Sequence, residues 1–518
     1  MKKIVLAALV MAAVLPAAAQ DTYESARLLG SDLNGTARYV GMGGAMEALG
    51  ADISTISTNP AGMGLFRHST ASLSFGLQSQ QDAQKFDGLN KTVMSFDQIG
   101  FVYACRMSPT SFVNFGFNYH KSRNFDQILS AANSLRNCSQ NGLTYYKGEK
   151  GLYEFDFNKN GDMIGWEPRT DYRSQIFSQA DYLNTNTLML DPDDKNVYFN
   201  DASGYTFDKA HRGWIADYDF NISGNSNDRF YWGITLGVKD VRYKAYSEYG
   251  EALEDSKGSC GSVSIGDQRK ITGSGYDIKA GVIFRPVETS PFRVGLSIST
   301  PTWYNLTSSN STYILNNTPY GSWDDGRSEE SYDFKYYTPW KFGASIGHTI
   351  GTSVALGVSY EYSDYGASKN RIIDGYDYYD NANTSTDELM KRNTEQALKG
   401  VHTLKAGLEF KPAPALALRV GANYVSAAYD KNGVRDMTID SPGVMYASTT
   451  DYTNWKDTYR LTCGLGYKAG GFNVDLAYQY SATNGEFHPF QPYAGGDAGA
   501  FDVSQKRHQV LLTLGYTF

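Results

Sequence analysis

The chain alternates apolar and polar side chains in many short segments. Near its C-terminal end, Val510, Leu512, Leu514, Tyr516 and Phe518 fall on one face of an extended segment, and the residues between them are mostly small or polar. Successive side chains of a β-strand point to opposite faces, so this pattern predicts a strand with one apolar face. The same pattern predicts fourteen strands, at residues 69–78, 96–106, 111–120, 213–223, 229–243, 271–285, 292–303, 333–348, 352–364, 401–411, 415–427, 456–468, 471–482 and 505–518.

The connections between these segments alternate between short and long. Short turns are predicted at 108–110, 225–228, 286–291, 350–351, 412–414 and 469–470. Long polar loops are predicted at 79–95, 121–212, 244–270, 304–332, 365–400, 428–455 and 483–504, with helices at 126–137 and 387–399. Short turns on one side and long loops on the other are typical of bacterial transmembrane barrels. The sequence therefore predicts an all-β fold, a transmembrane β-barrel of about 14 antiparallel strands formed by residues 67–518.

The N-terminal region differs from the rest of the chain. Lys2 and Lys3 precede an apolar run, and alanines up to Ala19 form a cleavage site, so residues 1–19 are predicted to be a signal peptide cleaved after about Ala19. No later apolar stretch reaches the 18 residues that a transmembrane helix needs. Residues 20–66 lack the alternation and are rich in small residues, and we expect them to be compact. These features predict the outer membrane of a bacterial cell as the location.

Composition agrees with this interpretation. The chain has 39 Tyr but only 7 Trp, and tyrosine suits strands and membrane-interface girdles because its ring is apolar and its hydroxyl is polar. A formal net charge of -8 leaves no basic footprint for nucleic acid. Charges of both signs fall on the faces predicted to line the lumen, where we expect ion pairs that stiffen the wall or hold a plug in place. They are Asp217, Asp219, Lys239, Lys279, Arg293, Lys341, Glu361, Lys405, Glu409, Arg419, Arg460 and Asp475.

Catalytic and metal-binding motifs are scarce. The seven histidines are scattered, with no HExxH spacing, and no segment has a GxSxG elbow, so the sequence predicts no enzyme and no cofactor. The four cysteines lack CxxC spacing. Cys138 and Cys260 lie in long loops on the same side of the predicted barrel, where an oxidising compartment allows a disulfide.

One loop matches the template of a calcium-binding loop. Asp156, Asn158, Asn160, Asp162 and Glu167 place oxygen donors at the expected offsets. The same stretch also matches a β-hairpin, because it alternates and contains the turn dipeptide Asn-Gly. No flanking helices are predicted, so the hairpin is the favoured interpretation and no metal is predicted.

The segment before the first strand contains Asn59, Pro60, Ala61, Gly62 and Met63. This motif resembles the FadL/TodX (OMPP1-type) family of outer-membrane transporters of hydrophobic compounds. The resemblance implies that residues 20–66, which carry Asn-Pro-Ala, form a hatch (plug) inside the lumen of a fourteen-stranded barrel. It also implies passive uptake of hydrophobic small molecules, of the long-chain fatty acid or aromatic-hydrocarbon class, with lateral exit through the wall near the third strand.

The third strand offers polar or small positions for contact with the hatch. We expect Asn114, Gly116 and Asn118 to lie at this contact, and the side chain of Asn59 to bind Asn114 or Asn118. Apolar loop residues are candidates for a capture surface, although ordinary loop packing is the alternative for each of them. They are Ile128, Leu129, Leu135, Leu143 and Tyr145.

An alternative function uses the barrel only as a membrane anchor. The chain would then be a surface binding protein, for haem capture or adhesion, and His211 and His488 lie in loops without a partner motif. For either function we expect a monomer that contacts outer-membrane lipid and lipopolysaccharide. Phe518 resembles the terminal aromatic signal of the barrel assembly machinery, which is an expected partner. A hydrophobic small-molecule ligand is expected only for the transporter.

Overall fold

The computed structural model of the chain describes residues 20–149, 154–159, 163–167, 175–189, 199–255, 258–319, 325–376, 378 and 382–518. The predicted signal peptide, residues 1–19, lies outside them. Fourteen strands form the barrel: β1 (Thr70–Gln80), β2 (Thr92–Ser108), β3 (Ser111–Asn124), β7 (Asp201–Ser226), β8 (Phe230–Asp255), β9 (Gly258–Phe284), β10 (Arg293–Ser299), β13 (Lys341–Ile350), β14 (Val354–Asp364), β17 (Gly400–Ala413), β18 (Leu416–Val425), β19 (Tyr452–Ala469), β20 (Phe472–His488) and β21 (Phe501–Thr517).

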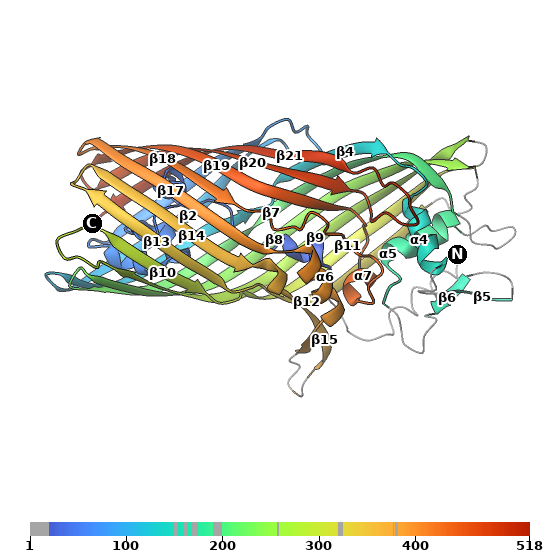
Figure 1. The fold of residues 1–518 in the computed structure, drawn as a ribbon, viewed down its shortest axis with the longest axis horizontal. Coiled ribbons are helices and arrows are strands. Elements are labelled where there is room, and N and C mark those ends of the chain that lie inside the picture. The colour runs from blue at the N-terminus through green and yellow to red at the C-terminus, as the bar shows by residue number, and fades with distance from the viewer. Residues whose placement is uncertain are drawn as a thin grey trace.

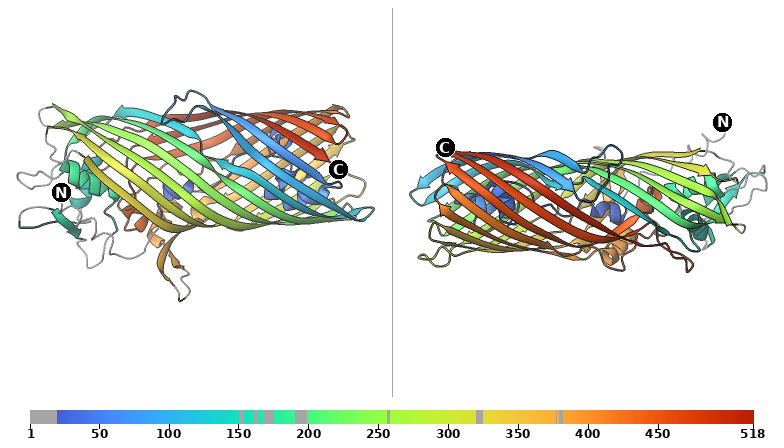
Figure 2. Two further views of the ribbon diagram at one scale, coloured as in Figure 1. Left: turned by 180° about the vertical axis from the view of Figure 1, so that it is seen from behind. Right: turned by 90° about the horizontal axis from the view of Figure 1, so that it is seen from above.

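Every one of these strands pairs antiparallel with its two neighbours. The last strand, β21, pairs with β1 from Thr70↔Thr517 to Gln80↔Arg507, which closes the cylinder (Figure 1). Short turns gather at one end of the cylinder, where the C-terminus lies, and the long connections gather at the other (Figures 1 and 2). The predicted strand number and the sorting of turns are therefore confirmed.

Additional short strands and helices lie at the end of the barrel with the long connections. The additional strands are β4 (Gln127–Ser134), β5 (Glu154–Phe157), β6 (Met163–Glu167), β11 (Trp303–Asn317), β12 (Asp325–Tyr337), β15 (Lys369–Tyr376) and β16 (Ala382–Thr386). The helices of this end are α4 (Gln140–Glu149), α5 (Gln179–Asn184), η3 (Thr185–Met189), η4 (Tyr365–Ala367), α6 (Glu388–Ala397) and α7 (Pro442–Met445). None of the helices formed by the described residues has both the length and the apolar character that crossing a membrane demands.

The exterior of the barrel carries an apolar band. Val510, Leu512, Leu514 and Tyr516 are each 38–42% exposed, whereas Leu511 beside them is fully buried. The predicted alternation of the last strand is thus confirmed, with its apolar face outward. Tyrosines border the band at the end with the long loops, where for example Tyr119 and Tyr218 lie with ring centroids 5.2 Å apart. An apolar band with aromatic borders is the exterior of a transmembrane barrel.

Two predicted strands are each divided at a proline. The segments 292–303 and 333–348 were expected to be continuous, but β10 ends at Ser299 before Pro301, and β12 ends at Tyr337 before Pro339. Proline has no N–H to donate to a β-ladder, so both strands end and the chain leaves its pairing partner at these points. Beyond these points the hairpin β11–β12 continues along β9, from Trp303↔Tyr276 to Asn317↔Ser262, and extends the wall beyond the apolar band.

One of the two helix predictions is wrong. Most of residues 126–137 belong to strand β4 (Gln127–Ser134). This strand pairs with β7 from Gln127↔His211 to Ser134↔Gly204. Strand β3 stops at Asn124 while β7 continues, so β4 satisfies an edge that would otherwise be unpaired. The prediction for 387–399 is confirmed by α6, whose N-cap Asp387 accepts a hydrogen bond from the Met390 N–H at 3.0 Å.

The expected disulfide is absent, because Cys138 and Cys260 are both free and buried. The carbonyl of Cys138 accepts from Ala202 on β7, while Cys260 lies on β9, and β8 separates the two strands. Two strand spacings amount to about 10 Å, which exceeds the reach of a disulfide.

The segment that matches the calcium-loop template lies partly outside the described residues, because these omit 160–162. The described backbone on either side forms the hairpin that was the favoured interpretation. Strand β5 pairs antiparallel with β6, from Glu154↔Glu167 to Phe157↔Met163.

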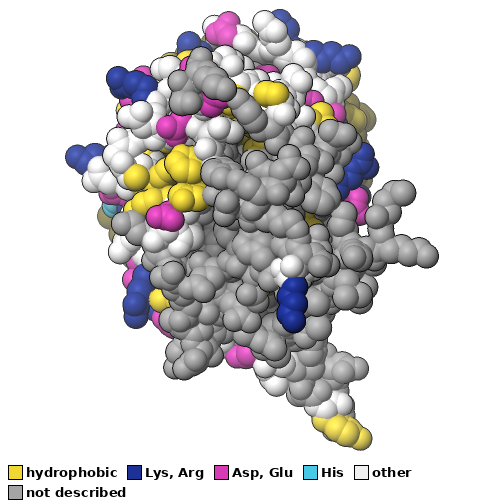
Figure 3. Space-filling view, turned by 90° about the vertical axis from the view of Figure 1, so that its right-hand side faces the viewer, with side chains coloured by type: hydrophobic (Ala, Val, Ile, Leu, Met, Phe, Trp, Pro, Cys, Tyr) yellow, Lys and Arg dark blue, Asp and Glu magenta, His cyan; other side chains and the backbone are white. Residues whose placement is uncertain are grey.

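An apolar cluster fills the lumen near the end with the long loops (Figure 3 views this end). It includes Leu129, Leu135 and Leu143, which are therefore packed in a core, the alternative expected for these loop residues, and Ile128 is buried in a smaller cluster. Tyr145 packs on Phe199, with ring centroids 4.7 Å apart. We call the apolar cluster with helices α4 and α5 the cap. Lys147 of α4 is fully buried and forms an ion pair with Asp181 of α5.

One carboxyl group makes the cap sensitive to pH. Glu251 of β8 is buried beneath α4, and burial raises its pKa from 4.5 to about 7, although its Oε1 accepts from the Tyr249 hydroxyl at 2.6 Å and from the Gln140 N–H at 2.8 Å. A raised carboxyl pKa means that the folded cap prefers the neutral acid. The stabilisation is complete below about pH 4.5 and is lost as the pH rises through 7.

We therefore expect hydrogen-exchange protection of residues 140–149 to fall between pH 6 and pH 8, after correction for the intrinsic exchange rate. Glu251→Gln keeps an uncharged hydrogen-bonding side chain, so its protection should stay constant over this range. Equal pH dependence in the two proteins would contradict the assignment to Glu251.

Candidate functional site

Residues 20–66, the N-terminal segment, lie inside the barrel (Figure 1, blue). Four turns organise this segment: α2 (Thr22–Ala26), α3 (Ala37–Gly41), η1 (Ile53–Ser57) and η2 (Pro60–Leu65). Each begins with a side chain that accepts a hydrogen bond from the first N–H groups of the turn. These capping residues are Asp21, Thr36, Asp52 and Asn59. Capping satisfies N–H groups that a short helix leaves unpaired, so the segment has a defined shape although it contains no long helix.

A row of glycines on the wall receives the segment. Gly347, Gly357, Gly407 and Gly421 are direct cross-strand partners on β13, β14, β17 and β18. A Cβ at Gly357 would overlap the carbonyl oxygen of Ala45, and one at Gly407 would overlap that of Met42. The sequence analysis did not identify this row, although the register of the predicted strands would align these four positions.

Charges on the inner wall are completed by charges of the segment. On the wall, Arg419 pairs with both Glu409 (2.6 Å) and Asp475 (2.5 Å), which leaves one negative charge in excess, and Arg38 of the segment pairs with Glu409 at 3.0 Å. The half-exposed Lys411 lies farther from Glu409, at 3.8 Å.

A neighbouring wall group has the opposite excess. Lys341 and Lys405 flank Glu361 at 3.2 and 4.0 Å, and Glu47 of the segment pairs with Lys405 at 2.8 Å. The expected ion-pair lining of the wall is thus confirmed at these residues, and in both groups the segment supplies the missing charge.

A third charged contact lies nearer the cap. Arg269 of β9 donates to Glu24 at 2.6 Å, and Arg435 donates to Asp21 at 2.7 Å. All four side chains are nearly inaccessible to solvent. Breaking a buried pair of this kind typically costs about 3–5 kcal/mol.

The Asn-Pro-Ala-Gly-Met motif lies at the end of the barrel with the short turns. Asn59 does not bind Asn114 or Asn118 as expected, because its amide points toward Gly281 of β9 and Gly295 of β10. Asn114 contacts the segment in another way, by donating to the carbonyls of Met63 (2.8 Å) and Phe66 (3.0 Å).

The other expected wall positions also lie beneath the segment or beside it. Gly116 lies under Met63, where a Cβ would approach the methionine methyl group at 2.8 Å. Asn118 accepts from Gln98 at 2.9 Å and has no hydrogen bond to residues 59–63.

The wall near the third strand is closed. Strand β3 pairs with β2 from Gln98↔His120 to Ser108↔Ser111 and with β7 from Phe112↔Asn225 to Asn124↔Trp214. Both ladders are interrupted only by bulges, at Arg106/Ser108 and at Lys121/Arg123. The lateral opening that the resemblance implied is therefore not present in the described wall.

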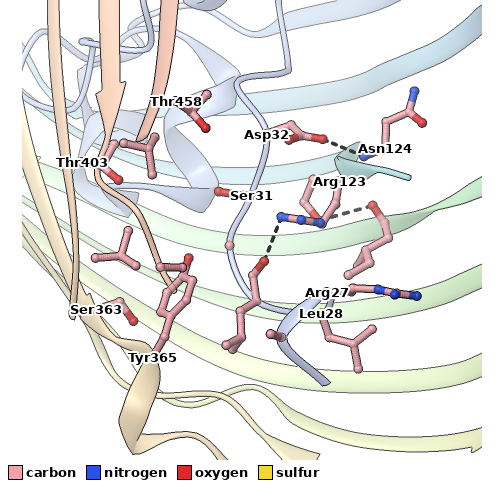
Figure 4. Close-up of a pocket in the computed structure, with 18 of the residues that line it drawn as sticks. Arg27, Leu28, Ser31, Asp32, Arg123, Asn124, Ser363, Tyr365, Thr403 and Thr458 are labelled. Carbon is pink, nitrogen blue, oxygen red and sulfur yellow. Dashed lines mark hydrogen bonds between the residues drawn. The ribbon is translucent and has the colours of Figure 1, made fainter. Parts of the chain in front are cut away.

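A cavity of about 370 Å³ lies in the lumen between the N-terminal segment and the cap. Residues 26–34 of the segment line one side together with β3, and Ser363, Tyr365 and Thr403 face them from the opposite wall (Figure 4). Residues 59–63 do not line it, and neither do Asn114, Gly116 and Asn118. The sequence-predicted site residues are thus brought together, but at the short-turn side of the cavity.

Three arginines lie close together at the cavity, and the carboxylates that attract them are those of Asp32 and Asp126. Arg460 of β19 lies 3.9 Å from Asp32, and Arg123 and Arg507 are close enough to repel it and each other electrostatically. Arg123 otherwise donates to the carbonyl of Leu29 at 2.8 Å, and Arg507 donates to that of Asp126 at 2.7 Å. Carbonyls carry no full charge, so this part of the cavity attracts anions.

The cavity also has an apolar side. Leu28, Leu29 and Phe125 line it and belong to one buried cluster, and the rings of Tyr365 and Tyr429 pack against that cluster. The cavity is therefore amphipathic, with guanidinium groups and aliphatic or aromatic surface a few side chains apart.

The histidines form no haem site among the described residues. His211 lines the cavity, but its Nδ1 lies 2.8 Å from the Tyr243 hydroxyl, and the ring of His488 stacks on Tyr452 at 4.7 Å. The alternation along the strands predicts Arg460 on the inner wall. No motif in the sequence assigns Asp32, Arg123, Tyr365 or Arg507 to a site. The inward face of the last strand contains Arg507, so the alternation alone could have found it.

Comparisons with known proteins identify solved structures of similar fold. Neither a protein family model nor a curated protein matches the chain. Solved structures similar to it include a FadL homologue of Pseudomonas aeruginosa (TM-score 0.51, 12% identity, 94% of this chain and 99% of that chain). Others are the monoaromatic hydrocarbon channel CymD (TM-score 0.49, 10% identity, 95% and 99%) and the toluene transporter TbuX of Ralstonia pickettii (TM-score 0.46, 11% identity, 94% and 99%). The chain has the fold of the FadL homologue, and at the level of fold this confirms the resemblance that the sequence indicates.

Proposed function

We propose that the chain is an outer-membrane channel for passive uptake of hydrophobic small molecules that carry an acidic head group, the fatty-acid class. The observation that carries this proposal is the amphipathic cavity enclosed between the cap and the N-terminal segment. A ligand's apolar tail fits the side formed by Leu28, Leu29 and Phe125, and its carboxylate fits the three arginines. A purely hydrocarbon ligand would leave these guanidinium groups buried with fewer carboxylates than positive charges, which is costly.

In this proposal the N-terminal segment is the hatch. It contacts the wall through the glycine row and supplies charges that the wall lacks, so the closed lumen blocks small polar solutes. The ligand leaves the cavity when the hatch moves, since the described wall near β3 is closed. Similarity in fold to the FadL homologue supports the channel, and no observation favours the alternative of a haem-binding or adhesive anchor.

The first prediction concerns closure by the hatch. Gly357→Ala places a methyl group against the carbonyl of Ala45, and overpacking of this kind costs about 1–3 kcal/mol. We expect the hatch to dock less tightly and the single-channel conductance in planar bilayers to rise above the wild-type value.

Gly343→Ala is the matched control, because it adds the same methyl group to the inner face of the neighbouring strand β13 but meets chiefly the Ser297 side chain. It should keep the wild-type conductance. The gel shift on boiling should be unchanged in both variants, which shows that the barrel is folded. Wild-type conductance of Gly357→Ala would contradict closure by this segment.

The second prediction concerns the ligand class. Dodecanoate should bind the purified protein in detergent more tightly than dodecanol, as measured by the fluorescence of Trp455, which lines the cavity. Arg460→Gln removes a charge-assisted hydrogen bond worth about 1.5–3 kcal/mol and should weaken dodecanoate at least tenfold while leaving dodecanol unchanged.

Arg106→Gln, at an exposed position of β2 near a short turn, is the control and should bind both compounds normally. Equal binding of dodecanoate and dodecanol would remove the acidic head group from the proposal. Binding of neither compound would contradict the uptake of hydrophobic molecules itself.

A further inference from the structure

The outer surface of the barrel has an unusual row of cations. Arg212 of β7, Lys244 of β8 and Lys270 of β9 are consecutive cross-strand partners. Lys244 and Lys270 are both exposed and point outward. Directly opposed side chains in an antiparallel pair have Cβ atoms about 5 Å apart, and like charges at this distance repel each other.

A second group of cations lies beside this row. Arg242 precedes Lys244 on the same face of β8, and its guanidinium lies 6.0 Å from the ring of Trp214. Lys121 belongs to β3, on the other side of β7 from Arg242, and its ammonium lies 4.8 Å from the Trp214 ring centre. We call Lys121, Arg212, Arg242, Lys244 and Lys270 the basic patch.

The described carboxylates neutralise only part of the basic patch. Asp87 pairs with Arg212 at 2.8 Å, and Asp240 pairs with Arg242 at 2.9 Å. Within the described part of the chain, neither Lys244 nor Lys270 has a carboxylate within 4.0 Å, and the neighbour of Lys270 on β11 is the uncharged Ser309. Among the described residues, the pair therefore lacks a counter-ion.

The height of the patch above the membrane identifies the kind of anion. Tyr218, Val238 and Tyr276 are register partners in the aromatic border of the apolar band. Lys244 is six residues beyond Val238, which is about 20 Å along the strand and about 15 Å along the axis of a barrel with tilted strands. The head-group layer of an ordinary bilayer extends only about 5–8 Å beyond the hydrocarbon, so a glycerophospholipid phosphate lies below Lys244.

We propose that the basic patch binds the phosphate groups of a saccharide-headed lipid of the outer leaflet. A phosphate between Lys244 and Lys270 supplies the missing counter-charge and accepts charge-assisted hydrogen bonds from both. Trp214 lies between the flanking cations, where an indole ring suits the boundary between lipid and water. This inference rests on the outer-membrane location proposed above, but not on the ligand of the lumen.

The test measures binding of fluorescent diphosphoryl lipid A to the purified protein in neutral detergent at fixed salt. Lys244→Gln with Lys270→Gln should weaken this binding tenfold or more. The same lipid without its phosphates should bind wild type no better than diphosphoryl lipid A binds the double variant.

Arg106→Gln with Lys468→Gln is the matched control, because it removes the same charge from exposed residues near the opposite end of the barrel. It should bind diphosphoryl lipid A as wild type does. An equal loss in the control would mean that only net charge matters, and unchanged binding in the test variant would place the lipid elsewhere, so either result overturns the proposal. A dimer that only the test variant loses, without any change in lipid binding, would make the patch a contact between copies and also overturn it.

Dodecanoate binding, measured in the same samples, separates this proposal from that of the lumen. It should be unchanged in both double variants. Loss of lipid A binding with intact dodecanoate binding supports the patch, whereas failure to bind dodecanoate leaves the patch result unaffected.

Discussion

Charges buried on the inner wall of a barrel are stable only when they are paired, and here the wall alone does not balance them. The wall group of Arg419, Glu409 and Asp475 has one negative charge in excess, and that of Lys341, Lys405 and Glu361 has one positive charge in excess. Residues Arg38 and Glu47 of the N-terminal segment provide the two opposite charges. Removal of the segment would leave both excess charges behind, so the segment is part of the folded barrel.

Close packing makes this pairing possible. An arginine or a glutamate on a short turn reaches the wall only if the backbone of the turn lies against it, and the row Gly347, Gly357, Gly407 and Gly421 permits that approach. The capping side chains hold each turn in shape, since no turn is long enough to be stable by itself. Above the segment, the cap closes the other end and leaves one amphipathic cavity between them. The proposed binding and gating of a ligand depend on this arrangement.

Much of the fold follows from the sequence, because alternation and turn length report the two faces and the two ends of a barrel. The strands that were predicted as continuous across Pro301 and Pro339 show where alternation is insufficient, since a change of partner leaves the pattern of side chains intact. Residues 126–137 were predicted to be helical because their local pattern is ambiguous. Their strand conformation is decided by the free edge of β7, which lies about 80 residues away along the chain.

The site was less predictable for the same reason. The Asn-Pro-Ala motif located the segment, but contacts between Asn59 and the wall depend on how the segment is oriented in the lumen, which no local pattern encodes. Arg123, Arg460 and Arg507 come from three strands that are far apart in sequence, and only the closure of the barrel brings them near Asp32.

The most direct test of this account exchanges the charges of one pair between the segment and the wall. Single-channel conductance is measured for Glu47→Lys, for Lys405→Glu and for the double exchange, each in a barrel that retains its gel shift on boiling. The account predicts that each single exchange opposes like charges, loosens the segment and raises the conductance, and that the double exchange returns it close to the wild-type value. Wild-type conductance in both single variants, or a double variant as conductive as the two effects combined, would contradict the claim that paired charges hold the segment in the lumen.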